Sequence, residues 1–478
     1  MGRADPGRPS DPTPRRVGVV IAGAGARGAY EAGALSVVVP RLAAADARPQ
    51  VFVGTSAGAI NATLLAAGAH LSPEDQAAAL LEVWRRIRTR DVLGPLLTST
   101  PRTAGTWLAQ RLGLGDVRLT GLVDTTPLSR TADAVVDWSR LRAGVDDGDC
   151  QALAVVATSA RTGRSVVFTD LAPGSALPPD DHDRALDYVA TEVGSAHVRA
   201  SAAIPAVFPP VRVTEPRERA GWYLDGGVRL NAPLKPALDL GCDAVVVVAT
   251  HPDTFATDGG ADHHDPPDVD DALVMLLDSA LADRMVEDLR MLTRVNELVA
   301  AGGRHSRPGR PLSVVPHLFA GPPERATLSR LAAAVYRERF TGLRGALRAL
   351  REPDLPLLAQ LLGGDGPRRG DALSYVFFDP EFIARAITLG RQHASALFAD
   401  VPDGEVPWRT APGAQAADPP DGGAAPSGHD RRATDRRATD PRATDPGAAD
   451  PTRDGDHRPV PPSRRARPGA TTRPGGPS

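Results

Sequence analysis

Two short apolar segments near the N-terminus each run into a glycine-rich turn and then into a helical pattern. The first covers residues 17–22 and precedes a helical pattern over residues 28–39. The second covers residues 51–53 and precedes one over residues 57–67. A short apolar run between turn residues is typical of a strand buried on both faces. Two such strand–turn–helix units in succession predict parallel strands covered by helices, which places the chain in the α/β class.

The same alternation continues further along the chain. Apolar runs predict strands at residues 153–158, 165–169, 244–249 and 312–315. Helical spacing of apolar residues predicts helices at residues 270–300, 328–350 and 375–398. We therefore expect a three-layer αβα sandwich with a mostly parallel central sheet, followed by a helical module and a disordered tail.

Composition suggests the limits of the folded part. Beyond Trp408 there is no aromatic residue, and Val460 is the only aliphatic residue larger than alanine. Such a segment buries too little apolar surface to offset its ordering entropy. We expect a disordered leader at residues 1–15 and an α/β domain at residues 16–320. A helical C-terminal extension is expected at residues 321–408 and a disordered low-complexity tail at residues 409–478.

Charge and cysteine content narrow the classes of partner. The formal net charge is −3, which gives no electrostatic reason to expect nucleic acid as a partner. The two cysteines, Cys150 and Cys242, form neither a disulfide framework nor a metal-ligand cluster. His263, His264 and Asp265 lie in a Pro/Asp/Gly-rich stretch, which is more typical of a solvated loop than of a metal site. We expect neither a metal nor a cofactor.

The N-terminal residues are polar and proline-rich, without the apolar stretch of a secretory signal. No segment has the run of about 18 apolar residues needed for a spanning helix. We therefore expect a cytoplasmic protein whose contact with a membrane, where it has one, is peripheral.

The first chemical motif is Gly54-Thr-Ser-Ala-Gly58, which follows the second predicted strand. A nucleophilic serine stands on a tight strand-to-helix turn, and its small neighbours relieve the crowding there. The helix N-terminus that follows also favours negative charge near Ser56. Ser56 is therefore a candidate nucleophile, although a Gly/Ser turn also arises by chance in a chain with 47 glycines.

The second motif is Gly23-Ala-Gly25-Ala-Arg-Gly28, directly after the first predicted strand. Its G-x-G-x-x-G pattern is also the fingerprint of a dinucleotide-binding turn. That function requires an acidic residue at the end of the second strand, whereas Asp46 precedes this strand. Next to a serine elbow, the amides of such a loop suit an oxyanion hole.

The third motif is Tyr223-Leu-Asp225-Gly-Gly227. A carboxylate followed by two glycines at a strand end can lie close to another loop. By itself, Asp-Gly most often marks an ordinary turn. The presence of the other two motifs makes Asp225 a candidate base.

Together the three motifs resemble the patatin-like phospholipase family. In that family a glycine-rich oxyanion loop, a G-x-S-x-G serine and a D-G-G or D-G-A aspartate follow one another in this order. Residues 201–210 and 231–233 match further stretches of the family, and the resemblance covers about residues 16–320. It implies a three-layer αβα fold and hydrolysis of acyl esters, in phospholipids or acylglycerols, by a Ser–Asp dyad without a histidine or a metal.

The resemblance also implies a role for each motif residue. It makes Ser56 the nucleophile, on an elbow with Gly54 and Gly58, and Asp225 the base, followed by Gly226 and Gly227. The oxyanion hole then lies in the loop of Gly23, Ala24, Gly25, Ala26, Arg27 and Gly28, around the amides of Ala24, Gly25 and Ala26. The family usually has glycine where this chain has Ala24, which would be strained if the position needed a positive φ.

Two other functions remain open from the sequence. An α/β-hydrolase-type esterase would need a histidine after the acid. The candidates for it are His251, His305, His317 and His393. A non-hydrolytic lipid-binding protein could also retain this fold, although intact Ser56 and Asp225 argue against it.

Overall fold

The computed structural model describes residues 16–94, 124–205, 207–255, 283–302, 306–307, 310–342, 345, 347–348, 355–356 and 369–410. These residues all belong to one compact unit, Met1–Gln415. The predicted leader, the cluster of His263, His264 and Asp265, and nearly all of the predicted tail lie outside the described residues.

Within the described residues, nine strands form one sheet in the order β11-β8-β1-β2-β3-β4-β5, with β7 pairing with β3 and β6 pairing with β7. The neighbours from β11 to β3 are all parallel, so the predicted mostly parallel α/β sheet is confirmed. The strands are β1 Val17–Ile21, β2 Pro49–Thr55, β3 Ala152–Ser159, β4 Ser165–Leu171, β5 Leu186–Ala190, β6 Val211–Val213, β7 Gly221–Asp225, β8 Ala244–Val248 and β11 His317–Ala320. A separate ribbon pairs β9, Ser306–Arg307, with β10, Arg310–Pro311.

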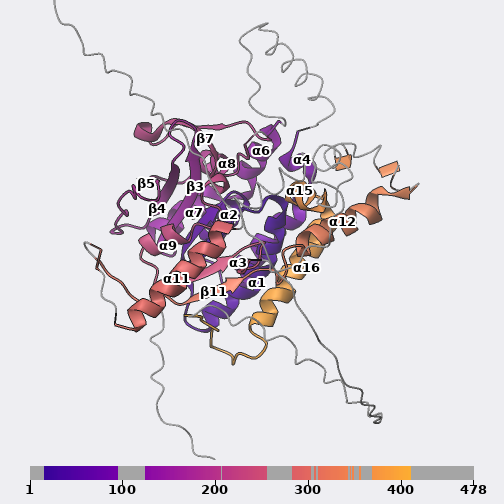
Figure 1. Ribbon diagram of the computed structural model, residues 1–478. Coiled ribbons are helices and arrows are strands. Elements are labelled where there is room, and N and C mark those ends of the chain that lie inside the picture. The colour runs from indigo at the N-terminus through magenta and orange to yellow at the C-terminus, as the bar shows by residue number, and fades with distance from the viewer. Residues whose placement is uncertain are drawn as a thin grey trace, which may run out of the picture. The chain divides into compact units, whose positions relative to one another are not determined.

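Helices cover both faces of this sheet (Figure 1). Alternate strand residues face opposite layers, so Val19 belongs to one hydrophobic cluster and Val20 to the other. The first layer holds α1 Gly28–Ala44, α2 Ala57–Ala67, α3 Pro73–Arg86, α4 Thr89–Val92, α6 Thr126–Val135, α7 Trp138–Asp146, α8 Ser195–Ser201, α12 Thr327–Phe340, α15 Arg369–Val376 and α16 Pro380–Leu397. The second layer holds α9 Leu234–Asp239 and α11 Arg284–Ala300.

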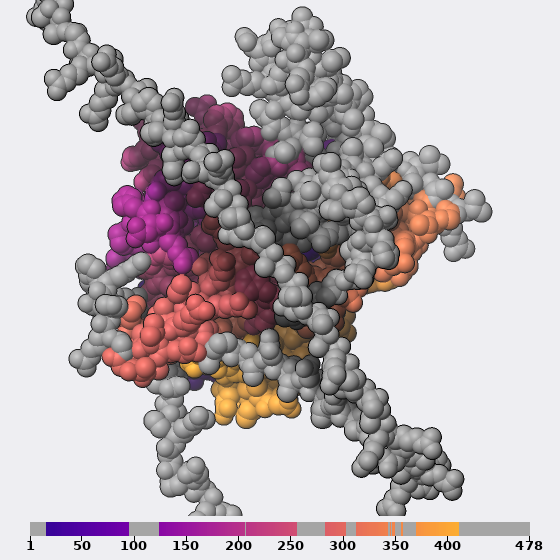
Figure 2. All heavy atoms as spheres, viewed as in Figure 1, coloured from indigo at the N-terminus to yellow at the C-terminus, as the bar shows by residue number. Residues whose placement is uncertain are grey.

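The C-terminal helices pack directly on the first helix of the chain. α16 lies along α1, and a Cβ atom added at Gly33 would collide with the Ile387 carbonyl oxygen. In the same way, a Cβ atom at Gly390 would collide with the Tyr30 carbonyl oxygen. Since only glycine allows this approach, the two backbones are in direct contact. In the space-filling view, these helices form the orange and yellow part of the surface (Figure 2).

Two predicted elements need correction. The strand predicted at residues 312–315 lies instead at β11, because the Val315 N–H and carbonyl both bond the Asn296 side chain, each at 2.9 Å. The helix predicted at residues 375–398 is divided into α15 and α16, where Asp379 caps α16 and Pro380 begins it.

The tail boundary at residue 409 stays a prediction. Arg409, however, exchanges two backbone hydrogen bonds with His317 of β11, at 2.8 and 2.9 Å. Its backbone is thus bound to the edge of the sheet.

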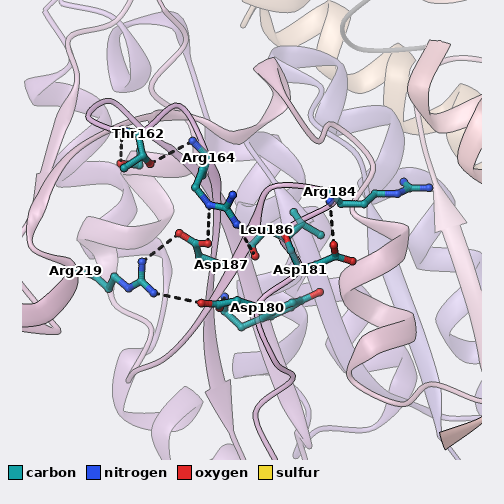
Figure 3. A network of polar contacts seen from close by, with 10 residues as sticks. Thr162, Arg164, Asp180, Asp181, Arg184, Leu186, Asp187 and Arg219 are labelled. Atoms are coloured by element: carbon teal, nitrogen blue, oxygen red, sulfur yellow. Dashed lines mark hydrogen bonds and ion pairs between the residues drawn. The ribbon is translucent and has the colours of Figure 1, made fainter. Parts of the chain in front are cut away.

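The opposite edge of the sheet, at β5, is lined by ion pairs (Figure 3). Asp187 accepts from Arg164 Nε at 2.8 Å and from Arg219 Nη1 at 3.1 Å. Arg219 also approaches Asp180 at 3.7 Å. Charged side chains on an edge strand discourage pairing with another chain, which suits the position of β5 at the edge of the sheet.

Candidate active site

Ser56 lies on a strained turn between β2 and α2. Its φ of 55° and ψ of −127° belong to a region that residues with a side chain rarely adopt. A Cβ atom at Gly54 would collide with the Gly58 backbone, and one at Gly58 with the Ala22 and Ile21 carbonyl oxygens. The two glycines therefore allow the turn to pack against the end of β1, which is the geometry that a nucleophile elbow requires.

The register of β3 brings Ser56 and Asp225 together. β2 pairs with β3 as far as Thr55, which lies opposite Val156. β7 runs in the opposite direction and ends at Asp225, opposite Ala157. Because β4 occupies the other edge of β3, the ends of β2 and β7 meet head to head on the same edge. A Cβ atom at Gly226 would collide with the Val156 carbonyl oxygen, so this meeting also depends on glycine.

The Asp225 carboxyl group is buried, with 4% of the residue exposed. Burial raises its pKa from the ordinary 3.8 to about 7, while hydrogen bonds from the Ser56 side chain and the Gly227 N–H lower it. The Gly227 N–H donates to Asp225 Oδ1 at 2.7 Å. A desolvated carboxylate with a pKa near neutrality can accept a proton from a neighbouring hydroxyl.

The loop after β1 presents a short series of backbone amides. The Gly23 N–H donates to the Asn231 carbonyl at 3.1 Å, and the Arg27 N–H to the Ala24 carbonyl at 3.1 Å. Gly25–Arg27 form a 3-10 turn, and the first N–H groups of such a turn have no acceptor within it. The candidate donors therefore narrow to the amides of Ala24, Gly25 and Ala26.

Ala24 fits this loop without strain, since its φ is −144° and the positive φ of +54° falls on Gly25. Alanine in place of the usual family glycine is therefore compatible with this loop conformation.

The Arg27 side chain is buried, with 1% of the residue exposed. Its Nε donates to Ser374 Oγ at 2.7 Å, and its Nη2 to Ser329 Oγ and the Asp371 carbonyl, each at 3.2 Å. The guanidinium also lies 3.9 Å from the centre of the Tyr375 ring. Arg27 therefore connects the loop to the C-terminal helices α12 and α15.

A narrow apolar pocket of about 60 Å³ opens beside Ser56. Ser56, Thr131 and Tyr375 supply its polar side chains, and the Thr131 hydroxyl donates to the Asp91 carbonyl at 2.6 Å. The remaining lining residues are Gly25, Ala57, Ile60, Trp84, Ile87, Val92, Leu128, Ala132, Val135, Val136, Val198, Ala202, Ile204, Phe208, Val376 and Phe378. Such a lining suits a hydrocarbon chain.

Buried polar contacts hold one wall of this pocket in place. Trp84 Nε1 donates to Asn61 Oδ1 at 2.7 Å, and Asn61 Nδ2 donates to Glu31 Oε2 at 3.1 Å. Burial raises the pKa of Glu31 well above its ordinary value. A raised pKa favours the neutral acid, which avoids the cost of a buried charge.

Two supporting residues have no motif role in the sequence. The Ser56 N–H donates to Ser201 Oγ at 2.9 Å, and Ser201 Oγ donates to the Val156 carbonyl at 2.6 Å. The Asn231 carbonyl fixes Gly23. Both lie in the stretches that also match the family, but neither residue was assigned a function from the sequence.

The side chains of His251 and His393 contact other groups, and His317 lies in a strand at the edge of the sheet. His251 Nε2 lies 3.3 Å from both Arg27 Nη1 and the Tyr375 hydroxyl. His393 Nδ1 lies 2.9 Å from the Tyr30 hydroxyl, and His317 is part of β11. His305 lies outside the described residues.

In the described part of the chain, no three His, Cys, Asp or Glu side chains are grouped so that they could hold a metal ion. Over the same residues, no helix combines the length and the hydrophobicity needed to cross a membrane.

Comparison with known proteins supports the family resemblance. Residues 19–238 match the family model described as Patatin-like phospholipase. The solved structures similar to this chain include VipD from Legionella pneumophila, at 14% identity over 81% of this chain and 67% of that chain. The TM-score between the two structures is 0.31. No curated protein matches the sequence. The family match spans β1 to α9 and contains all three motifs.

Proposed function

We propose, on the premise that residues 19–238 form a patatin-like phospholipase domain, that the chain hydrolyses acyl esters of lipids through Ser56 and Asp225. The family supports a lipid acyl hydrolase in general terms. The assignment of the two residues depends on their position in this chain, where β2 and β7 meet.

In the proposed reaction, Ser56 Oγ attacks the ester carbonyl carbon while Asp225 accepts the hydroxyl proton. The carbonyl oxygen becomes an oxyanion, which the amides of Ala24, Gly25 and Ala26 stabilise. The C–O bond to the alcohol then breaks, and the alcohol leaves with the proton from Asp225. Water attacks the acyl-enzyme, Asp225 again accepts a proton, and the fatty acid leaves as Ser56 regains its hydrogen.

One observation carries this proposal: a serine in a strained elbow interacts with a buried carboxyl group at the end of an apolar pocket. The pocket holds the acyl chain of the substrate. Because the enzyme meets its lipid in a membrane or a lipid particle, we further propose peripheral contact with such a surface from a cytoplasmic location.

The test is hydrolysis of a panel of phospholipids, acylglycerols and a soluble ester by the wild type and by variants. We expect Ser56→Ala and Asp225→Asn each to lower kcat by about 10⁴-fold or more, and the double variant to be no worse, because residues that act as one unit are not additive. Asp133→Asn, an exposed change on α6, serves as the matched control and should keep full activity. Full activity of Ser56→Ala would refute the proposal.

The same panel separates the alternatives. An esterase that uses a histidine would lose activity on replacement of His251, His305, His317 or His393 by alanine. A lipid-binding protein without activity would retain lipids in a binding assay and hydrolyse none of them. Activity that disappears with a chelator would contradict the metal-free mechanism.

A further inference from the structure

The apolar pocket is not built by the family-matched residues alone. Tyr375, Val376 and Phe378 line it from the end of α15 and the turn after it, more than a hundred residues beyond the matched segment. Part of the pocket wall is thus contributed by a segment of the chain that the family match does not include.

This C-terminal wall is fixed at the catalytic end of the pocket. A Cβ atom at Gly25 would collide with the Tyr375 carbonyl oxygen, so the oxyanion loop and residue 375 are in backbone contact. Arg27 reinforces this contact through Ser374 and through its stacking on the Tyr375 ring. Tyr375 therefore lies beside the amides that face the ester.

The wall is also held at the Phe378 end of the segment. The Thr89 hydroxyl, at the start of α4, donates to the Phe378 carbonyl at 3.4 Å. Val92 of the same helix lines the pocket together with Phe378. Residues 375–378 thus cross from the oxyanion loop to α4, a span of at most roughly 10 Å for three residues.

The neighbouring Phe377 does not take part in this wall. Its ring packs against Phe340, Tyr336 and Phe382, with centroid separations of 6.4, 6.2 and 5.5 Å. The two adjacent phenylalanines therefore pack in different places: Phe377 packs among the C-terminal helices, and Phe378 lines the pocket.

We propose that the segment Tyr375–Phe378 sets the length of the acyl chain that the enzyme accepts, with Phe378 closing the remote end and Val376 narrowing the middle. This inference rests on the proposed function, since it assigns a substrate preference to the same pocket. Arg27 acts as a positioning residue that holds the segment against the oxyanion loop.

The test measures kcat/KM for a series of p-nitrophenyl esters from butanoate to palmitate. Phe378→Ala should raise the ratio of long-chain to short-chain kcat/KM by about tenfold or more, because each methylene in an apolar pocket contributes on the order of tenfold. Val376→Phe fills the pocket and should shift the ratio in the opposite direction. Phe377→Leu is the matched control and should leave the profile unchanged while lowering the melting temperature.

The outcomes separate the inference from the proposed function. If Ser56→Ala hydrolyses the whole series as the wild type does, the proposed function fails. If Ser56→Ala is inactive but neither pocket variant changes the profile, only the assignment of the C-terminal wall fails. If Phe378→Ala does not fold, Val376→Phe decides the question, since it adds volume instead of opening a cavity. A shift produced equally by Phe377→Leu would also overturn the inference.

Discussion

The buried Asp225 carboxyl should make activity and stability change in opposite directions as the pH rises. Its pKa is about 7 in the folded chain, whereas the same group exposed to water has an ordinary value of 3.8. Between these two values the folded state holds a proton that the unfolded state has released. The contribution of Asp225 to the free energy of unfolding therefore falls as the pH rises from about 4 to about 7, and then levels off.

The size of this loss follows from the separation of the two pKa values. About 3 pH units at 1.36 kcal/mol each amount to about 4 kcal/mol of unfolding free energy. Asp225→Asn removes the ionisation, and an amide oxygen can still accept the Gly227 N–H. The variant should therefore be more stable than the wild type above pH 7 and close to it near pH 4.

The measurement is urea unfolding of the wild type and of Asp225→Asn at a series of pH values from 4 to 9. Subtracting the two curves cancels the other titrating groups and isolates Asp225. In parallel, wild-type kcat/KM on a soluble ester should rise through about pH 7, where the base becomes ionised. Parallel stability curves for the two proteins over the whole range would refute the reasoning.

Two further predictions concern the oxyanion loop and the tail. Gly25→Val should lower kcat by about 10²-fold or more, because a β-branched side chain strains the positive φ and meets the Tyr375 carbonyl. Arg27→Ala should lower activity less than Ser56→Ala; ester kinetics that reverse this order would contradict the backbone oxyanion hole. Deleting residues 411–478 should leave the melting temperature and hydrolysis of a soluble ester nearly unchanged. A cut before Arg409 should lower that temperature, since it removes the bridge to His317.

The sequence was informative where one residue type satisfies a local constraint. Short β-branched runs predicted β1 and β8, and α2 was predicted at its observed bounds, because these elements depend on nearby residues. The sequence indicated that the positions beside Ser56 are crowded and need small residues. In the structure, Gly54 and Gly58 are in close contact with neighbouring backbone atoms. β6 escaped prediction, because three residues show too little periodicity to stand out.

The rest depends on contacts between distant parts of the chain. The meeting of Ser56 and Asp225 depends on the register of β3, which no local pattern encodes. Arg27 lies beside the oxyanion motif in sequence, yet its partners Ser374 and Ser329 are some 300 residues away. The contribution of the C-terminal helices to the pocket was therefore beyond sequence reasoning.

The packing of α16 on α1 has a consequence for synthesis of the chain. Tyr30 and His393, which join the two helices, are 363 residues apart in sequence. At ribosomal rates of about 5–20 residues per second, α1 waits roughly 20 to 70 s for its partner. During this interval the apolar surface of α1 that α16 covers is open to other chains and to chaperones. A nascent chain that stalls before residue 380 would already contain Ser56 and Asp225 and still leave its first helix uncovered.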